Sequence, residues 1–143
     1  MVDTLSPAER SKRMSLIRSS DTGPEMLVRR SLHSKGFRFR LHRRDLPGTP
    51  DIVLPKYRVA ILVNGCFWHA HHCQKRRIPG TRSEFWAEKL AKNRKRDARN
   101  KRLLKKGGWR VITVWECELS TAYRAQRRWK KLMREILIEG GRN

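Results

Sequence analysis

The chain has 143 residues, of which 38% are apolar, and this is enough for one domain with one buried core. Its 35 Lys and Arg residues against 13 Asp and Glu residues give a formal net charge of +22 spread along the chain, so we expect a polyanionic partner, by default nucleic acid. No apolar run approaches the roughly 20 residues of a membrane span, and the first ten residues lack the apolar stretch of a signal peptide, so we exclude membrane and secreted proteins and expect a soluble, cytoplasmic one.

Two helices are predicted at the N-terminal end. A basic helix within residues 1–20 opens at a capping box over 6–9, with Pro at its first helical position. A second helix opens at residues 22–25, and Gly36 ends it.

Three strands are predicted next. Apolar and polar residues alternate over 37–41, the turn at 47–50 ends that strand, and residues 51–54 begin another. A turn at 55–58 then leads into the apolar run 59–63, which is typical of a buried strand.

The rest of the chain alternates between helix and strand. Residues 81–84 have the pattern of a capping box and open a long helix, which the glycine pair 107–108 ends. A central strand follows over 109–115, and residues 120–143 form an amphipathic helix. This order predicts one α/β domain, spanning 1–143, with a mixed central sheet flanked by helices.

A metal-binding pattern follows the buried strand. Residues 65–73 combine Cys and His with two large aromatics, and the third cysteine follows the strand at 109–115, so two strand ends could bring four ligands to one ion. A disulfide with a spare thiol is the alternative, but three cysteines do not make a disulfide framework. Thiolate and imidazole ligands at this spacing suit a structural zinc, held by Cys66, His71, Cys73 and Cys117.

Acidic residues are scarce, and Asp51 has a distinctive position. It begins a strand whose hairpin partner ends at the metal loop, where a carboxylate among many cations could hold Mg²⁺ against a scissile phosphate. Considered alone, Asp51 is more simply a turn residue paired with an Arg, and Glu25 belongs to a capping box. The convergence of Asp51, the surplus His69, the metal loop and the paired strands on one sheet edge favours a catalytic site.

Five segments of the sequence also carry a specific family resemblance, and they lie at 46–51, 64–69, 84–86, 92–97 and 108–117. They closely resemble the very short patch repair (Vsr) endonucleases. The resemblance implies a restriction-endonuclease-like fold with a structural zinc. It also implies a Mg²⁺-dependent nick 5′ of the T in a T:G mismatch, the product of 5-methylcytosine deamination.

The resemblance implies roles for individual residues. It assigns zinc to the four residues named above and Mg²⁺ to Asp51 and the backbone carbonyl of Val63. Glu25 resembles the outer carboxylate that orients metal-bound water, and His69 resembles the group that stabilises or protonates the leaving 3′ oxygen. Asn64 stands where well-known members carry His, and it can bind a water ligand but cannot accept a proton.

The resemblance also implies how DNA is contacted. Phe67 and Trp68, with Met14, resemble a wedge that enters the base stack beside the mismatch, and Lys12 and Arg13 would contact the DNA from the same N-terminal helix. Core packing is the alternative for the two aromatics, but neighbours on an irregular loop cannot easily both face one core. The expected protein is a monomer on double-stranded DNA in a bacterial-type nucleoid, with a MutL-type mismatch-repair protein as a candidate partner.

Other classes stay open. On charge alone a ribosomal-type RNA binder fits as well as a DNA enzyme. A zinc-containing nucleic-acid-binding module without catalysis would explain the charge and the cysteines, but it would not need Asp51 or Mg²⁺. A nuclease of the His-Asn-His metal-finger type would make His69 the base and Asn64 its orienting partner, and it leaves the Asp51 hairpin unexplained.

Overall fold

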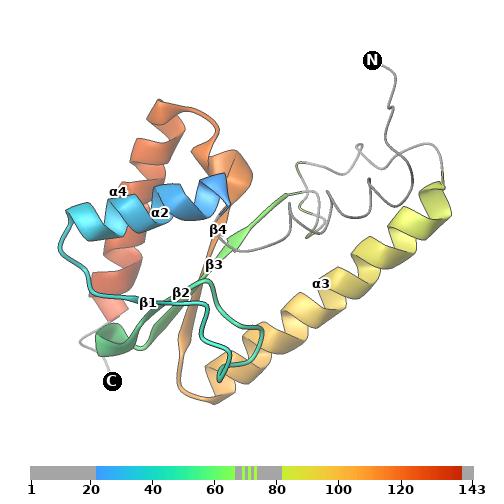
Figure 1. Cartoon of the computed structure of the whole chain (residues 1–143), viewed down its shortest axis with the longest axis horizontal. Helices are drawn as coiled ribbons and strands as arrows, with labels where there is room; N and C mark the ends of the chain where they lie inside the picture. The colour runs from blue at the N-terminus through green and yellow to red at the C-terminus, as the bar shows by residue number, and fades with distance from the viewer. Residues whose placement is uncertain (1–21, 67–68, 70, 72, 74–81, 140–143) are drawn as a thin grey trace.

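The structure is a computed structural model that describes residues 22–66, 69, 71, 73 and 82–139 (Figure 1). The helix expected within residues 1–20 lies outside these residues. The described elements are, in chain order, α2 (Gly23–Ser34), β1 (Arg40–Leu41), β2 (Ile52–Leu54), β3 (Val59–Asn64), α3 (Ser83–Lys106), β4 (Arg110–Trp115) and α4 (Ala122–Glu139), with short 3₁₀ turns at Pro55–Tyr57 and Glu116–Leu119.

The four strands form one mixed sheet in the order β1-β2-β3-β4. β1 and β2 are antiparallel, as are β2 and β3, whereas β3 and β4 run parallel, with Val59 opposite Arg110 and Asn64 opposite Trp115. Parallel neighbours need a long crossover connection, and α3 lies within it. Both strands therefore end at the same edge of the sheet. The predicted mixed α/β architecture is confirmed.

Helices cover both faces of the sheet, and the side chains of β2 alternate between the cores on the two faces. Ile52 and Leu54 belong to the larger core cluster, which includes Leu32 of α2 and Ile136 of α4. Val53 belongs to a smaller cluster on the other face, with Leu104 of α3. In Figure 1, α2 and α4 accordingly lie together on one side of the sheet and α3 lies on the other.

Two local predictions are corrected. The strand expected over 37–41 is reduced to Arg40–Leu41, although Phe37 and Phe39 still pack against the core, so their alternation reflects burial without ladder hydrogen bonds. α3 begins one residue later than its predicted capping box implies. Its N-cap is Arg82, whose left-handed backbone (φ 58°) sets the start of the helix without a side-chain cap.

The turn between β1 and β2 depends on a glycine. Gly48 has φ +75°, and a Cβ at this position would lie 2.9 Å from Cβ of Asn100 on α3. Only glycine meets both requirements without strain. This close contact holds the segment that precedes Asp51 against α3.

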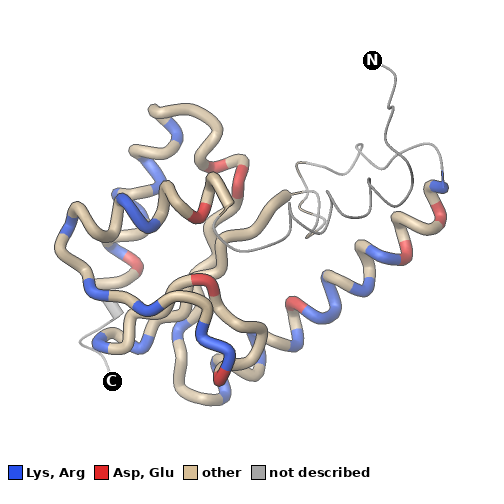
Figure 2. Tube along the Cα trace, in the orientation of Figure 1, with Lys and Arg blue, Asp and Glu red and all other residues tan. Residues whose placement is uncertain are grey.

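Basic residues dominate the exposed surface of α3. Figure 2 shows Lys and Arg along its whole length, with few acidic residues between them. A cationic helix of this length offers a large surface to a polyanion. None of the described helices is long and apolar enough to cross a membrane.

Candidate active site and metal centre

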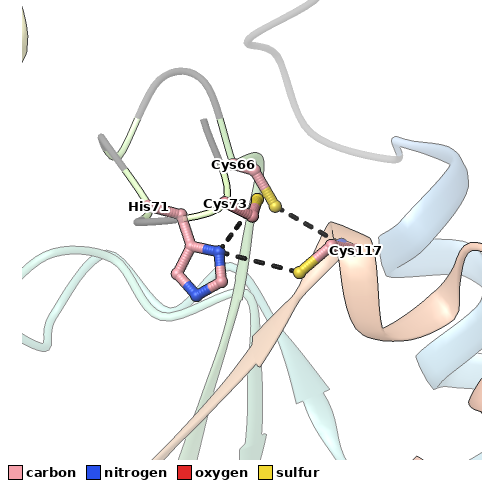
Figure 3. Close-up of side chains that lie close together, drawn as sticks. All are labelled: Cys66, His71, Cys73 and Cys117. Carbon is pink, nitrogen blue, oxygen red and sulfur yellow. Dashed lines mark hydrogen bonds between the residues drawn. The ribbon is translucent and has the colours of Figure 1, made fainter. Parts of the chain in front are cut away.

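The parallel pairing of β3 and β4 brings distant cysteines together. Cys66 follows β3 and Cys117 follows β4, and the Cys117 N–H lies 3.3 Å from Sγ of Cys66. His71 Nδ1 lies 3.1 Å from Sγ of Cys73 and 3.6 Å from Sγ of Cys117 (Figure 3). The four ligand atoms all lie within 4.8 Å of one another. We call these four residues the Cys/His cluster.

The cluster has the donor set of a closed tetrahedral site. All three cysteines of the chain are among the described residues and are free, so the disulfide alternative is wrong. Burial raises the pKa of Cys66 to about 12 and also raises the pKa of Cys117. A divalent cation would reverse this effect, because it deprotonates the thiols that bind it. Three sulfurs and one imidazole nitrogen fit zinc well.

Neighbouring side chains support the cluster. The His71 ring stacks on Trp115 at the end of β4, with ring centroids 4.0 Å apart. The backbone N–H of Cys66 donates to the Glu116 carboxylate at 3.3 Å. The ring of His71 and the backbone of Cys66 are therefore both held from β4 and the turn after it, and such outer contacts fix ligand orientation.

A second polar site lies beside β3, where Asp51 precedes β2. The Val63 N–H donates to Oδ2 of Asp51 at 2.8 Å. The N–H and C=O groups of a residue in an extended strand point to the same edge of that strand. The Val63 carbonyl therefore also faces the Asp51 side of β3.

Glu25 and His42 complete this second site. Glu25 is only 2% exposed, although it carries a carboxylate. Its Oε2 lies 2.8 Å from Nε2 of His42 and 3.2 Å from Nη1 of Arg29. One ligand atom from each of Glu25, His42 and Asp51 lies within 4.8 Å of the others. We call these three residues the acid cluster.

His69 has an acidic partner on α3. Its Nδ1 lies 2.5 Å from Oδ2 of Asp97, and both side chains are partly exposed. Asp97 thereby fixes the orientation of the imidazole.

The charge of Asp51 depends on this environment. Burial raises its pKa to about 6, and the negative charge of Glu25 adds to the effect. The Val63 N–H and the nearby imidazoles of His42 and His69 act in the opposite direction. Two carboxylates in a partly buried site attract a cation.

We expect Asp51→Asn to stabilise the protein in the absence of Mg²⁺ at pH 8 by about 1–3 kcal/mol. The unfolded chain releases the Asp51 proton near pH 4, whereas the folded protein keeps it until about pH 6. The free energy of unfolding of the wild type therefore falls as pH rises from about 4 to about 6 and stays reduced above, while Asn has no charge to desolvate. Thermal unfolding of both proteins from pH 4 to pH 8, in buffer without Mg²⁺ and without a chelator, measures the difference.

The matched control for this prediction is Asp45→Asn. Asp45 is exposed and ion-paired with Arg43, which lowers its pKa, so this variant should gain no stability. If the unfolding curves of Asp51→Asn and the wild type coincide at pH 8, burial does not penalise the Asp51 charge.

Comparison with known proteins identifies the family. The family model for the DNA mismatch endonuclease Vsr matches residues 2–75. The chain is 46% identical over 119 residues to the DNA mismatch endonuclease Vsr of Escherichia coli, a match that covers 83% of this chain and 76% of that protein. The chain belongs to the Vsr family.

Further Vsr relatives are named as nicking enzymes. The type II nicking enzyme V.XorIIP of Xanthomonas oryzae is 52% identical over 120 residues, which cover 84% of this chain and 88% of that protein. V.NmeAIP of Neisseria meningitidis is 44% identical over 136 residues, which cover 95% and 97%. These relatives and the family match make the chain an endodeoxyribonuclease of DNA repair, as predicted.

The structure brings together several of the residues predicted for the site, namely Glu25 with Asp51, and Cys66 with His71, Cys73 and Cys117. Asn64 is 5% exposed and follows Val63 on β3. His42 and Asp97 were missed, and the only available signal was that Asp97 is a rare acidic residue within a family segment of a basic helix. The expected DNA-contacting residues lie outside the described part of the chain: Lys12, Arg13, Met14, Phe67 and Trp68.

Proposed function

We propose that this protein nicks duplex DNA 5′ of the T in a T:G mismatch, with Mg²⁺ as cofactor, in very short patch repair of deaminated 5-methylcytosine. The observation that carries the proposal is the acid cluster beside the sheet of this Vsr family member. In this cluster Asp51 accepts a hydrogen bond from the backbone N–H of Val63. A binding module without catalysis has no need for two carboxylates in a partly buried site.

The proposal extends to the whole chain. Residues 1–143 form a single restriction-endonuclease-like domain, in which 1–20 is a basic helix that contacts DNA and 120–143 is the C-terminal amphipathic helix. The mixed sheet supports this, because it has helices on both faces and an acidic residue at the start of a β-hairpin.

The Cys/His cluster binds a structural zinc in this proposal. Its three thiols and one imidazole would saturate a tetrahedral ion and leave no open position for chemistry. The role of the ion is to stiffen the loop 65–73, which carries Phe67, Trp68 and His69. A stiff loop can hold aromatic side chains against a base stack without collapsing into the core.

The acid cluster binds the catalytic Mg²⁺, with Asp51 and the Val63 carbonyl as direct ligands. Oxygen ligands suit Mg²⁺, and the cation would stabilise the negative charge that develops on the phosphate. Glu25, held by Arg29, orients a water molecule toward the phosphate. Asn64 positions water through its amide, which hydrogen-bonds without taking up a proton.

His69 donates a proton to the leaving 3′ oxygen in this proposal. The Asp97 carboxylate accepts a hydrogen bond from Nδ1 of His69 and thereby orients the ring for this step. The opposite nitrogen delivers the proton. The strand break then yields a neutral 3′ hydroxyl rather than a free alkoxide.

Recognition combines stacking with charge. Phe67, Trp68 and Met14 would enter the base stack, because a wobble pair is easier to unstack than a matched pair. Lys12 and Arg13 would contact the backbone phosphates, and the basic surface of α3 would add sequence-independent affinity. The protein would act as a monomer at the bacterial nucleoid in the cytoplasm, with a MutL-type protein as a candidate partner.

The decisive experiment compares two labelled duplexes that differ only in a T:G or a C:G pair, each with and without Mg²⁺. We expect one nick on the T strand, 5′ of the T, that requires Mg²⁺ and is about 10- to 100-fold faster on T:G, because stacking contributes roughly 1 to 3 kcal/mol per base. Binding to both duplexes without any nick would indicate the zinc-containing binding module. Equal nicking of both duplexes would remove the mismatch from the proposal.

A further inference from the structure

His42 has no role in the proposed reaction, yet its position is unusual. It follows β1, and its backbone has φ 48°, in the left-handed region that non-glycine residues seldom adopt. Its N–H donates to the backbone carbonyl of Asp51 at 3.0 Å. The backbone conformation thus ties His42 directly to Asp51.

The side chain of His42 lies against the two carboxylates of the acid cluster. Its Nε2 lies 2.8 Å from Oε2 of Glu25, and the cluster's three ligand atoms lie within 4.8 Å of one another. Neighbouring ligands of an octahedral cation, each at about 2.1 Å from the ion, are separated by about 3 Å. The hydrogen bond between Glu25 and His42 has nearly this length, so a cation that replaced the shared proton would require little movement of either side chain.

The charges around the cluster also suit a cation. Glu25 and Asp51 contribute two carboxylates, and Arg29 offsets part of the charge of Glu25. The three ligands come from α2, from the loop after β1 and from the residue before β2, so packing of three separate segments sets the geometry. A preformed set of two oxygens and one nitrogen results.

We propose that His42 is a direct ligand of the divalent cation in this site, together with Asp51 and Glu25, and that the site therefore prefers first-row transition cations such as Mn²⁺ over Mg²⁺. The inference rests on the proposed function for the location of the cation, but it replaces the ligand set given there, because Glu25 binds the cation directly instead of orienting a water molecule. Imidazole nitrogen is a good ligand for transition metals, whereas Mg²⁺ favours oxygen and gives up its water reluctantly.

Mn²⁺ provides the test, because it is paramagnetic and, as a cation that suits oxygen ligands, it should not replace zinc at the thiolates of the Cys/His cluster. Pulsed electron paramagnetic resonance on the zinc-loaded protein with Mn²⁺ and no DNA should detect one directly bonded imidazole nitrogen. His42→Asn should abolish this signal. Asn is the suitable replacement because it tolerates left-handed backbone.

Two variants assign the signal. His33→Asn changes an exposed histidine in the last turn of α2 and should leave the nitrogen signal unchanged. His69→Asn should also retain it. Loss of the signal in His69→Asn but not in His42→Asn would overturn the proposal, as would bound Mn²⁺ without any nitrogen coupling in the wild type.

Affinity provides a second readout. His42→Asn should weaken Mn²⁺ binding by about tenfold or more, the usual cost of disturbing a metal site, while Mg²⁺ binding changes by less than about threefold. Equal losses for both cations would mean that His42 only positions Glu25, and this would overturn the proposal. Thermal unfolding checks that the variant folds.

The proposed function can fail separately from this inference. Nitrogen coupling without any nicking of the T:G duplex would leave His42 as a ligand in a protein with another reaction. Nicking with Mg²⁺ by a protein that shows no nitrogen coupling would retain the reaction and overturn the role of His42.

Discussion

Asp51→Asn should still bind a T:G duplex about as tightly as the wild type, or more tightly, while nicking falls by several orders of magnitude. The carboxylate is the charged ligand of the proposed Mg²⁺, and an amide oxygen in its place would bind the cation weakly. In the proposed complex, DNA affinity would depend on the basic surface and the aromatic wedge, which the substitution leaves intact. Loss of a group needed only for the chemical step lowers the rate without lowering affinity.

Single-turnover nicking at saturating enzyme, with binding measured in parallel without divalent cations, separates the two effects. Asp45→Asn is again the matched control, because Asp45 is a nearby acidic residue that pairs with Arg43 at the surface. It should nick at the wild-type rate. A rate for Asp51→Asn within about tenfold of the wild type would remove Asp51 from the catalytic site.

Cys117→Ser should unfold or aggregate the protein. The proposed zinc joins the ends of β3 and β4, and apparent binding energies at structural zinc sites reach about 10 kcal/mol or more, as much as the stability of a whole domain. Circular dichroism and metal analysis of the purified wild type and variant provide the measurement. The wild type should contain about one zinc per chain.

The control for the zinc prediction uses the wild type itself, because every cysteine of the chain belongs to the cluster. A strong chelator should unfold the protein, and added zinc should restore both the circular dichroism signal and the nicking activity. A folded, active preparation without zinc would contradict the prediction.

The elements with strong local signals were predictable from the sequence. The capping residue Thr22 predicted the start of α2, and the apolar runs predicted β3 and β4 close to their observed bounds. These patterns could be read from the sequence because they are local. The approach of Cys66 to Cys117 was also predictable, because a ligand after each of two strands meets at one edge if the strands run parallel.

Contacts between distant segments could not be predicted in the same way. His42 is 17 residues from Glu25, and His69 is 28 residues from Asp97, and no spacing rule relates them. The partly buried Arg110 is another example, because its guanidinium donates to the carbonyls of Glu135 and Ile136 in α4. A basic residue in a basic chain gives no sign that it will bind a helix of the same protein. Such contacts follow from the packing of the whole fold.

The position of β3 between the two clusters has a thermodynamic consequence. Val63 lies in β3 and Cys66 lies in the turn that follows this strand, so their Cα atoms are at most about 10 Å apart. The proposed ion at the Cys/His cluster would restrict this segment, and it would thereby lower the entropy lost when the acid cluster binds the proposed second ion. Linkage requires the effect to be reciprocal, so each ion raises the affinity for the other by the same factor. The two sites should therefore titrate as a cooperative pair.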